Sequence, residues 1–171
     1  LYTIRDKLGR VEGLKVVIVG DISHSRVARS NVWGLTRLGA HVTLCGPATL
    51  LPPELSRAFA EAGDLLAAEE DLEKSLEGAD VVMALRLQQE RQTQGLLPSI
   101  REYVRRYQIN QERFRRAHPQ ALLLHPGPVI EGVEVSAEVA RSAHSVIDEQ
   151  VENGVAVRMA LLYLMAGGGE V

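Results

Sequence analysis

The order of apolar and amphipathic segments is the feature that most constrains the fold of this 171-residue chain. Residues 13–21 form an almost continuous apolar run that ends near a glycine, which is typical of a strand buried in a parallel sheet. A helix is predicted over about 25–38, where apolar residues recur near helical spacing until Gly39. Alternation of this kind predicts right-handed βαβ units. We therefore expect an α/β, Rossmann-like, three-layer fold in which helices flank a parallel sheet.

The same alternation continues along the rest of the chain. Further strands are predicted at 41–45, 64–67, 79–85 and 121–124. Further helices are predicted at about 52–62, 71–77, 99–106, 110–117 and 148–166. Residues 86–97 are polar and long for a connection in a compact domain, which indicates a functional loop. The chain length fits one domain over residues 1–171.

Composition argues against several classes of partner. The net charge of -3 leaves no basic footprint for nucleic acid, and no apolar run is long enough for a membrane span. A single cysteine, Cys45, cannot form an internal disulfide, which favours a reducing compartment such as the cytoplasm. No metal-ligand spacing is present, and residues 20–26 do not follow the G-x-G-x-x-G pattern. We therefore expect no metal and no dinucleotide cofactor.

The final predicted helix, 148–166, is apolar around much of its circumference. A helix on the surface of one domain needs only an apolar stripe. Two interpretations follow, and the sequence does not decide between them. The helix either lies in the centre of the core or buries a second face against something outside this chain.

His125-Pro126-Gly127-Pro128 follows directly after the apolar run 121–124. Proline fixes φ and lacks an amide donor, whereas glycine readily adopts positive φ, so this segment predicts a stiff corner at a strand end. In open α/β sheets, ligands bind beyond the carboxyl ends of the strands. The corner is therefore either a binding element, whose carbonyl groups meet a ligand, or a plain turn.

Arg26, Arg86 and Gln88 are expected at the same edge of the sheet. Arg26 begins the first predicted helix after a strand, and Arg86 and Gln88 follow another strand with the spacing that points two side chains to one side. Arginine binds carboxylates with two parallel hydrogen bonds, so these residues together suit a small dicarboxylate. An ordinary surface arginine is the alternative for each.

Other polar residues near this edge give less specific indications. His24 and His125 are candidate acids or bases, and Ser23 and Ser25 are more plausible as helix caps than as nucleophiles. No nucleophile–base pair is evident. Catalysis, if present, would therefore rest on positioning and on charge stabilisation.

Four segments in register resemble the aspartate carbamoyltransferase family. They are residues 19–31, residues 85–91, the corner 125–128 and the final segment 150–160. The resemblance implies transfer of a carbamoyl group from carbamoyl phosphate to L-aspartate in pyrimidine biosynthesis. Related ornithine enzymes carry a cysteine after the histidine of the corner. Here Pro126 takes that place, which favours aspartate.

The resemblance also implies a role for each candidate site residue. Arg26, Arg86 and Gln88 would bind the aspartate carboxylates. The Pro126 carbonyl would orient the reacting amine and the carbamoyl NH₂. Gly127 and Pro128 would lie beside carbamoyl phosphate.

Members of this family have two domains, and this chain resembles the second, aspartate-binding domain alone. It begins at Leu1 rather than methionine, which fits either removal of a tag or initiator segment or an absent N-terminal domain. The resemblance implies an absent N-terminal carbamoyl-phosphate domain, and a complete enzyme that is a homotrimer, with or without further subunits. Residues 129–132 depart from the family pattern because Glu131 stands where a basic residue is usual. Two other functions stay open: a carbamoyltransferase with a different acceptor, and a non-catalytic binding or scaffold module.

Overall fold

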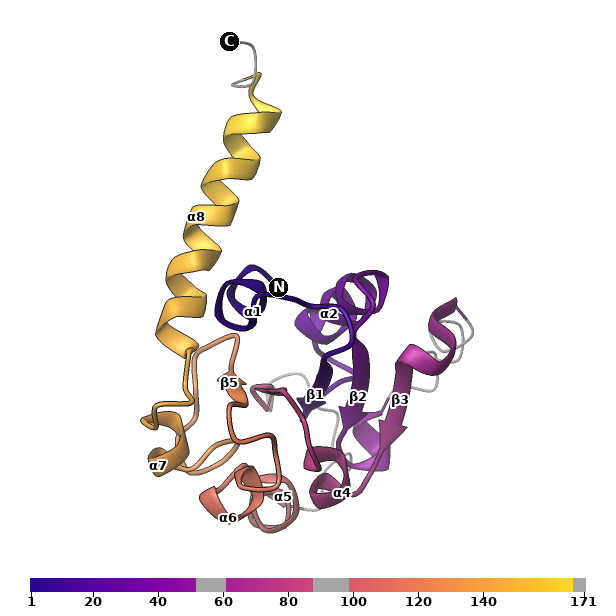
Figure 1. The fold of residues 1–171 in the computed structure, drawn as a ribbon. Helices are drawn as coiled ribbons and strands as arrows, with labels where there is room; N and C mark the ends of the chain where they lie inside the picture. Colours follow the sequence, from indigo (N-terminus) through magenta and orange to yellow (C-terminus); the bar gives the residue numbers. More distant parts are fainter. Residues whose placement is uncertain (52–60, 88–98, 168–171) are drawn as a thin grey trace.

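A parallel sheet of five strands forms the middle layer of the described part of the protein, confirming the predicted fold class (Figure 1). The computed structural model describes residues 1–51, 61–87 and 99–167. The strand order is β3-β2-β1-β4-β5. The strands are β1 (Lys15–Val19), β2 (His41–Cys45), β3 (Leu66–Glu69), β4 (Val81–Ala84) and β5 (Leu122–Leu124).

Helices cover both faces of this sheet, as Figure 1 shows in the view along its edge. One face is covered by α1 (Tyr2–Leu8) and α2 (Arg26–Arg37). The other is covered by α4 (Leu72–Leu76), α5 (Ile100–Tyr107), α6 (Gln111–Phe114) and α7 (Ala137–Ala140). The last helix is α8 (Ile147–Met165), and two short 3₁₀ turns lie at Ala48–Leu50 and Gly63–Leu65.

Alternating side chains of each strand enter two different cores. On β1, Val16 and Ile18 pack beneath α1 and α2, whereas Val17 and Val19 pack against α4 and α5. Successive side chains of a strand point to opposite faces, so a strand covered on both sides must be apolar throughout. This requirement explains why β1, β4 and β5 read as continuous apolar runs.

Side-chain caps set where several helices begin. The Ser25 hydroxyl accepts a hydrogen bond of 3.1 Å from the Ala28 N–H at the start of α2, which confirms Ser25 as a cap. Comparable caps begin four further helices, from the side chains of Asp71, Ser99, Asn110 and Ser136. The predicted helices at 71–77, 99–106 and 110–117 therefore exist, with ends that differ by a few residues.

Other predictions differ from the structure or fall outside it. The third strand was expected at 64–67, but a 3₁₀ turn holds residues 63–65 and β3 begins only at Leu66. α1 and α7 were not predicted at all. Residues 52–60 of the helix expected at 52–62, and residues 88–98 of the expected functional loop, lie outside the described part.

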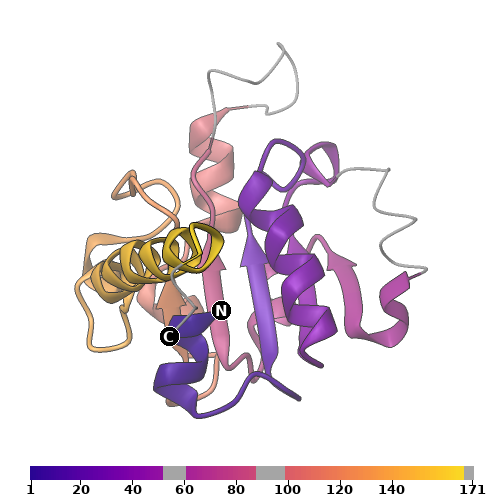
Figure 2. The ribbon, with the colours of Figure 1, turned by 90° about the horizontal axis from the view of Figure 1, so that it is seen from above.

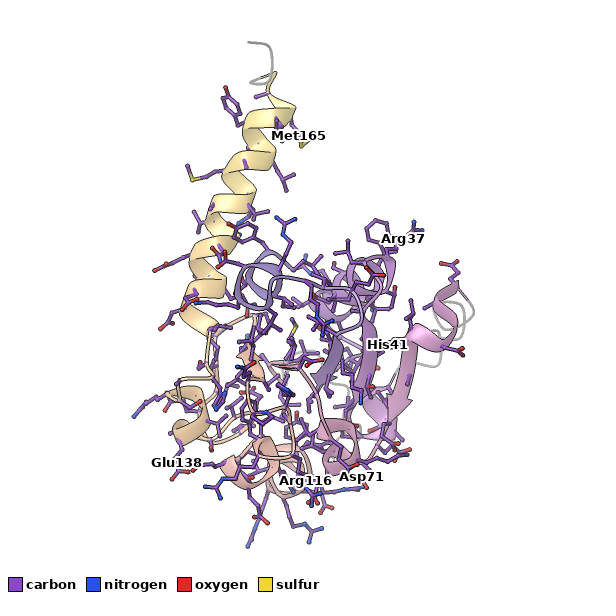
Figure 3. The ribbon with its side chains drawn as sticks, viewed as in Figure 1. Arg37, His41, Asp71, Arg116, Glu138 and Met165 are labelled. Atoms are coloured by element: carbon purple, nitrogen blue, oxygen red, sulfur yellow. The ribbon has the colours of Figure 1, made fainter. Side chains whose placement is uncertain are left out.

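α8 projects from the body of the molecule, and Met165 marks its far end (Figure 3). Near its start, Asn153 donates a hydrogen bond of 3.1 Å to the Thr3 hydroxyl, and Glu149 pairs with Lys7. None of its described residues is buried, so the interpretation of this segment as a central core helix is wrong. Among the described residues, no helix is long and apolar enough to cross a membrane.

Two glycines allow β1 and β2 to end in close contact. A Cβ atom on Gly46 would lie 2.6 Å from the Gly20 carbonyl oxygen, closer than any side chain can approach. A Cβ atom on Gly20 would lie 3.1 Å from both the Leu85 carbonyl oxygen and the Tyr103 hydroxyl. Gly46 therefore requires glycine for space, whereas at Gly20 tight contacts combine with a φ of +129°, a conformation that favours glycine.

Candidate functional site

The strand order reverses between β1 and β4, and the candidate residues follow these two strands and the adjacent β5. β2 pairs with β1 on one side, and β4 pairs with β1 on the other. In open α/β sheets, ligands bind outside the carboxyl ends of the two strands at which the order reverses, here β1 and β4. Figure 2 shows the carboxyl ends of the strands along one edge, where α2 begins. Segments from β1, β4 and β5 therefore meet at one edge, as predicted.

Arg26 is the first residue of α2 and its side chain is exposed. The turn that leads to it is held by Asp21, which is fully buried. The Asp21 Oδ1 atom lies 2.7 Å from His24 Nδ1 and accepts a hydrogen bond of 3.2 Å from the His24 backbone N–H. His24 thus braces the turn between β1 and Arg26 rather than standing alone in the site.

Arg86 lies two residues beyond the end of β4. Its side chain is half-buried and its Nε atom is shielded from solvent. The Leu85 N–H donates a hydrogen bond of 2.8 Å to the Val19 carbonyl, which extends the β1–β4 pairing to the residue before Arg86. Gln88, the third predicted aspartate ligand, lies outside the described residues.

The corner after β5 has the stiff geometry that its sequence predicts. Gly127 has φ of +71°, in the region that favours glycine, and the Gly127–Pro128 peptide bond is cis. The Gly127 N–H donates a hydrogen bond of 2.9 Å to His125 Nδ1. The His125 N–H donates one of 3.1 Å to the Gln150 side chain at the start of α8. Pro126 is thereby held between two anchored residues.

His125 is buried beneath this corner, so it does not face a substrate as an acid or base. Its side chain is 0% exposed, and burial lowers its pKa to about 4. Because Nδ1 accepts from Gly127, the neutral ring carries its hydrogen on Nε2. Nε2 lies 4.0 Å from Glu134 Oε2, too far for a hydrogen bond. We conclude that His125 shapes the corner.

Glu134 lies at this edge of the sheet, and the sequence analysis did not single it out. It is 1% exposed, and its carboxylate accepts hydrogen bonds from the Leu87 N–H at 3.0 Å and from the Ile130 N–H at 2.9 Å. It therefore touches both the segment after β4 and the loop after the corner. The available signal was an acidic residue between Val133 and Val135, in a segment otherwise suited to burial.

Glu131 lies on the surface and forms an ion pair of 3.0 Å with Arg141. This surface position agrees with the expectation that Glu131 has no role in binding anions. Among the described residues, no group of three or more His, Cys, Asp or Glu side chains could hold a metal ion. Arg26 and Arg86 thus follow β1 and β4 at the edge where the corner follows β5, and arginine is the residue type that suits a small dicarboxylate.

A cavity of about 340 Å³ lies away from this edge, near the start of β5. Phe114, His118 and His144 are among the residues that line it. None of the predicted site residues contributes to it. Figure 3 places Arg116 and Glu138 on this side of the molecule, far from the end of α8.

Comparison with known proteins identifies the family. Residues 12–165 match the family described as "Aspartate/ornithine carbamoyltransferase, Asp/Orn binding domain". The chain is 58% identical over 169 residues to the aspartate carbamoyltransferase catalytic subunit of Pelotomaculum thermopropionicum, covering 99% of this chain and 53% of that protein. It is 60% identical over 167 residues to the subunit of the same name from Roseiflexus sp., covering 98% and 52%. The chain thus spans about half the length of the curated relatives it matches.

Solved structures of the same family share this architecture. Ornithine carbamoyltransferase from Pyrococcus furiosus matches with a TM-score of 0.85 and 31% identity, over 98% of this chain and 54% of that one. Aspartate transcarbamoylase from Trypanosoma cruzi, solved in complex with carbamoyl aspartate and phosphate, matches with a TM-score of 0.80 and 26% identity, over 94% and 51%.

Proposed function

This chain belongs to the aspartate/ornithine carbamoyltransferase family, and we propose that it is the aspartate-binding half of an aspartate carbamoyltransferase catalytic subunit. Its reaction is the transfer of a carbamoyl group from carbamoyl phosphate to L-aspartate, which yields N-carbamoyl-L-aspartate and phosphate for pyrimidine biosynthesis. The observation that carries the proposal is the placement of Arg26 and Arg86 after β1 and β4, where the strand order reverses.

The charge of this edge favours aspartate over ornithine as the acceptor. Two guanidinium groups attract the two carboxylates of aspartate, whereas the side-chain ammonium of ornithine would meet like charge. Pro126 also follows His125 in place of the cysteine expected of the ornithine enzymes. Two relatives named aspartate carbamoyltransferase catalytic subunit are 58% and 60% identical to the chain.

In the proposed reaction, the amine of aspartate attacks the carbamoyl carbon. A C–N bond forms, the C–O bond to phosphate breaks, and phosphate leaves with the electron pair. The proton that the amine loses is taken up by the departing phosphate. Arg26, Arg86 and Gln88 hold the carboxylates, and the Pro126 carbonyl accepts a hydrogen bond from the amine or the carbamoyl NH₂. Gly127 and Pro128 flank carbamoyl phosphate. Rate enhancement arises from positioning and charge stabilisation, without a covalent intermediate.

We further propose that a second domain completes the site and assembles the enzyme as a homotrimer. The relatives are about twice as long as this chain, which supports a carbamoyl-phosphate domain outside these residues. The exposed apolar side chains of α8, including Leu162 at 68% exposure, suit burial against that domain. The free, buried Cys45 is compatible with a reducing compartment such as the cytoplasm.

The test joins the N-terminal half of the Pelotomaculum thermopropionicum subunit to Leu1 of this chain, giving the fused protein. We expect carbamoyl aspartate from carbamoyl phosphate and aspartate with the fused protein, and none with the 171-residue chain alone. Succinate should compete with aspartate, because it presents the same carboxylates without the amine. Turnover by the chain alone, or competition by basic amino acids instead of succinate, would contradict the proposal.

A further inference from the structure

Glu134 is a charged residue in an environment that normally excludes charge. Its side chain is 1% exposed, and it belongs to the loop that connects β5 with α7. Its two carboxylate oxygens are used separately. Oε1 accepts a hydrogen bond from the Leu87 N–H, and Oε2 accepts one from the Ile130 N–H. The residue therefore connects the segment of Ile130 in its own loop with Leu87, which lies 47 positions before Glu134 in the sequence.

The two segments joined by this carboxylate carry the proposed substrate-binding groups. Leu87 follows Arg86 directly in the sequence. Ile130 lies two residues after Pro128, at the end of the corner. Each hydrogen bond fixes a backbone amide rather than a mobile side chain, so the carboxylate constrains the separation of the two segments.

Burial for stability alone is a poor explanation of this arrangement. Desolvation of a carboxylate opposes folding, and the bonds it gains often only compensate for that cost. Burial raises the pKa of Glu134, although the bonds from Leu87 and Ile130 and the nearby charge of Arg86 act in the opposite direction. An apolar residue would fill the same space without this conflict, but it could not hold two amides.

We propose that Glu134 is a positioning residue for the carbamoyl transfer, which sets the distance between Arg86 and the Pro126 carbonyl. It does not touch the substrates. It holds the segment after β4 against the corner after β5, so that the group that binds a carboxylate and the group that orients the amine keep a fixed separation. This inference rests on the proposed function of the site.

The matched variants are Glu134→Gln and Glu131→Gln in the fused protein. Both remove one negative charge from the same loop, but Glu131 is exposed and paired with Arg141 on the surface. A glutamine at 134 has one acceptor oxygen for two N–H donors, so one of the two links is lost. We expect KM for aspartate to rise at least about tenfold in Glu134→Gln, the scale of one charge-assisted hydrogen bond, and to stay within about twofold in Glu131→Gln.

A merely structural role would not separate the two substrates. We therefore expect KM for carbamoyl phosphate to stay within about twofold of the unmodified value in Glu134→Gln, because the proposed N-terminal carbamoyl-phosphate domain of the fused protein supplies most of the groups that hold this substrate. Equal changes in both KM values, or no change in the KM for aspartate, would overturn the proposal.

Amide hydrogen exchange gives a second readout that does not depend on activity. In the unmodified fused protein, the Leu87 and Ile130 amides should be protected to a similar extent, and Glu134→Gln should release at least one of them. Unprotected exchange of either amide in the unmodified protein would overturn the proposal that Glu134 holds both segments. If the fused protein formed no carbamoyl aspartate while both amides stayed protected, the proposed function would be wrong. The two hydrogen bonds of Glu134 would then have a structural role only.

Discussion

At the scale of single residues, Arg86 offers the most direct test of aspartate binding. Replacement of Arg86 by alanine in the fused protein removes one guanidinium group from the proposed carboxylate site. We expect KM for aspartate to rise about 100-fold, which corresponds to the loss of a charge-assisted, bidentate interaction. Steady-state kinetics with varied aspartate would measure this change.

Arg116→Ala is the control for this replacement. Arg116 is an arginine that pairs with Glu73 at 2.6 Å, and it lies before β5 rather than beyond the carboxyl end of a strand. Its loss should leave KM for aspartate unchanged. Equal KM values for the two variants would show that Arg86 does not bind the substrate.

His125 predicts how stability depends on pH. Its folded-state pKa is about 4, below the value of about 6.5 for an unfolded histidine, so the unfolded chain takes up the proton first as pH falls. The contribution of His125 to the free energy of unfolding is therefore present in full above about pH 6.5 and is lost as the pH falls towards 4. We expect the free energy of unfolding to fall by about 2 kcal/mol from pH 7.5 to 5, measured by urea denaturation. The raised pKa of Glu134, 4.0 Å away, has the opposite sign and offsets part of this loss.

His125→Asn separates this effect from general acid sensitivity. Asparagine retains an acceptor for the Gly127 N–H but does not titrate. The loss of stability between pH 7.5 and 5 should shrink in His125→Asn and persist in His41→Asn, which alters an exposed histidine. An unchanged pH dependence in His125→Asn would exclude His125 as its source.

At the scale of elements, α8 predicts self-association of the 171-residue chain on its own. Met159 and Leu162 are 65% and 68% exposed and lie three residues apart, on one side of the helix. We expect the chain to form oligomers that Met159→Glu with Leu162→Glu disperses, as measured by light scattering after size-exclusion chromatography. Because this part of α8 is exposed, the melting temperature of the body should not change.

Glu152→Gln is the control on the same helix, since it alters an exposed charge and leaves the apolar side chains intact. It should associate like the unmodified chain. If the unmodified chain were monomeric at high concentration, α8 would not be a docking surface.

Elements were predictable where burial dictates sequence. β1, β2, β4 and β5 were found because strands covered on both faces must be apolar. α1 and α7 were missed because they are short, and only two and one of their residues, respectively, are buried. β3 was misplaced because the 3₁₀ turn before it takes up part of the same apolar run.

The candidate site was predictable as far as strand ends and residue types reveal it. Arg26, Arg86 and the corner could be assigned to the carboxyl edge of the sheet because each follows an apolar run, and their roles in binding stay predictions. Glu134 was missed because its role depends on contacts with Leu87, far away in sequence. His125 was misjudged as a candidate acid or base because its burial follows from packing alone.

At the scale of the whole molecule, the two cores share the same strands and should unfold together. Val17 and Ile18 are adjacent on β1, are at most 2% exposed, and belong to different cores. We expect Ile18→Ala to cost about 3 kcal/mol and Val17→Ala somewhat less, both within one cooperative transition. Urea denaturation followed by circular dichroism and by Trp33 fluorescence would measure both. Two separate transitions would show that the cores are independent.

The crowded glycines at the ends of β1 and β2 also determine how the sheet tolerates slippage. A one-residue shift in pairing turns every side chain of a strand to the opposite face of the sheet. In a strand that is apolar on both faces, this shift buries no polar side chain, so the hydrophobic pattern does not prevent it. Gly20 and Gly46 oppose it. A shift of β1 would put a Cβ atom 3.1 Å from the Leu85 carbonyl oxygen, and a shift of β2 would put one 2.6 Å from the Gly20 carbonyl oxygen. A one-codon deletion within β1 should therefore be far more damaging than one at the helix–strand connections, where length can vary without moving this pair.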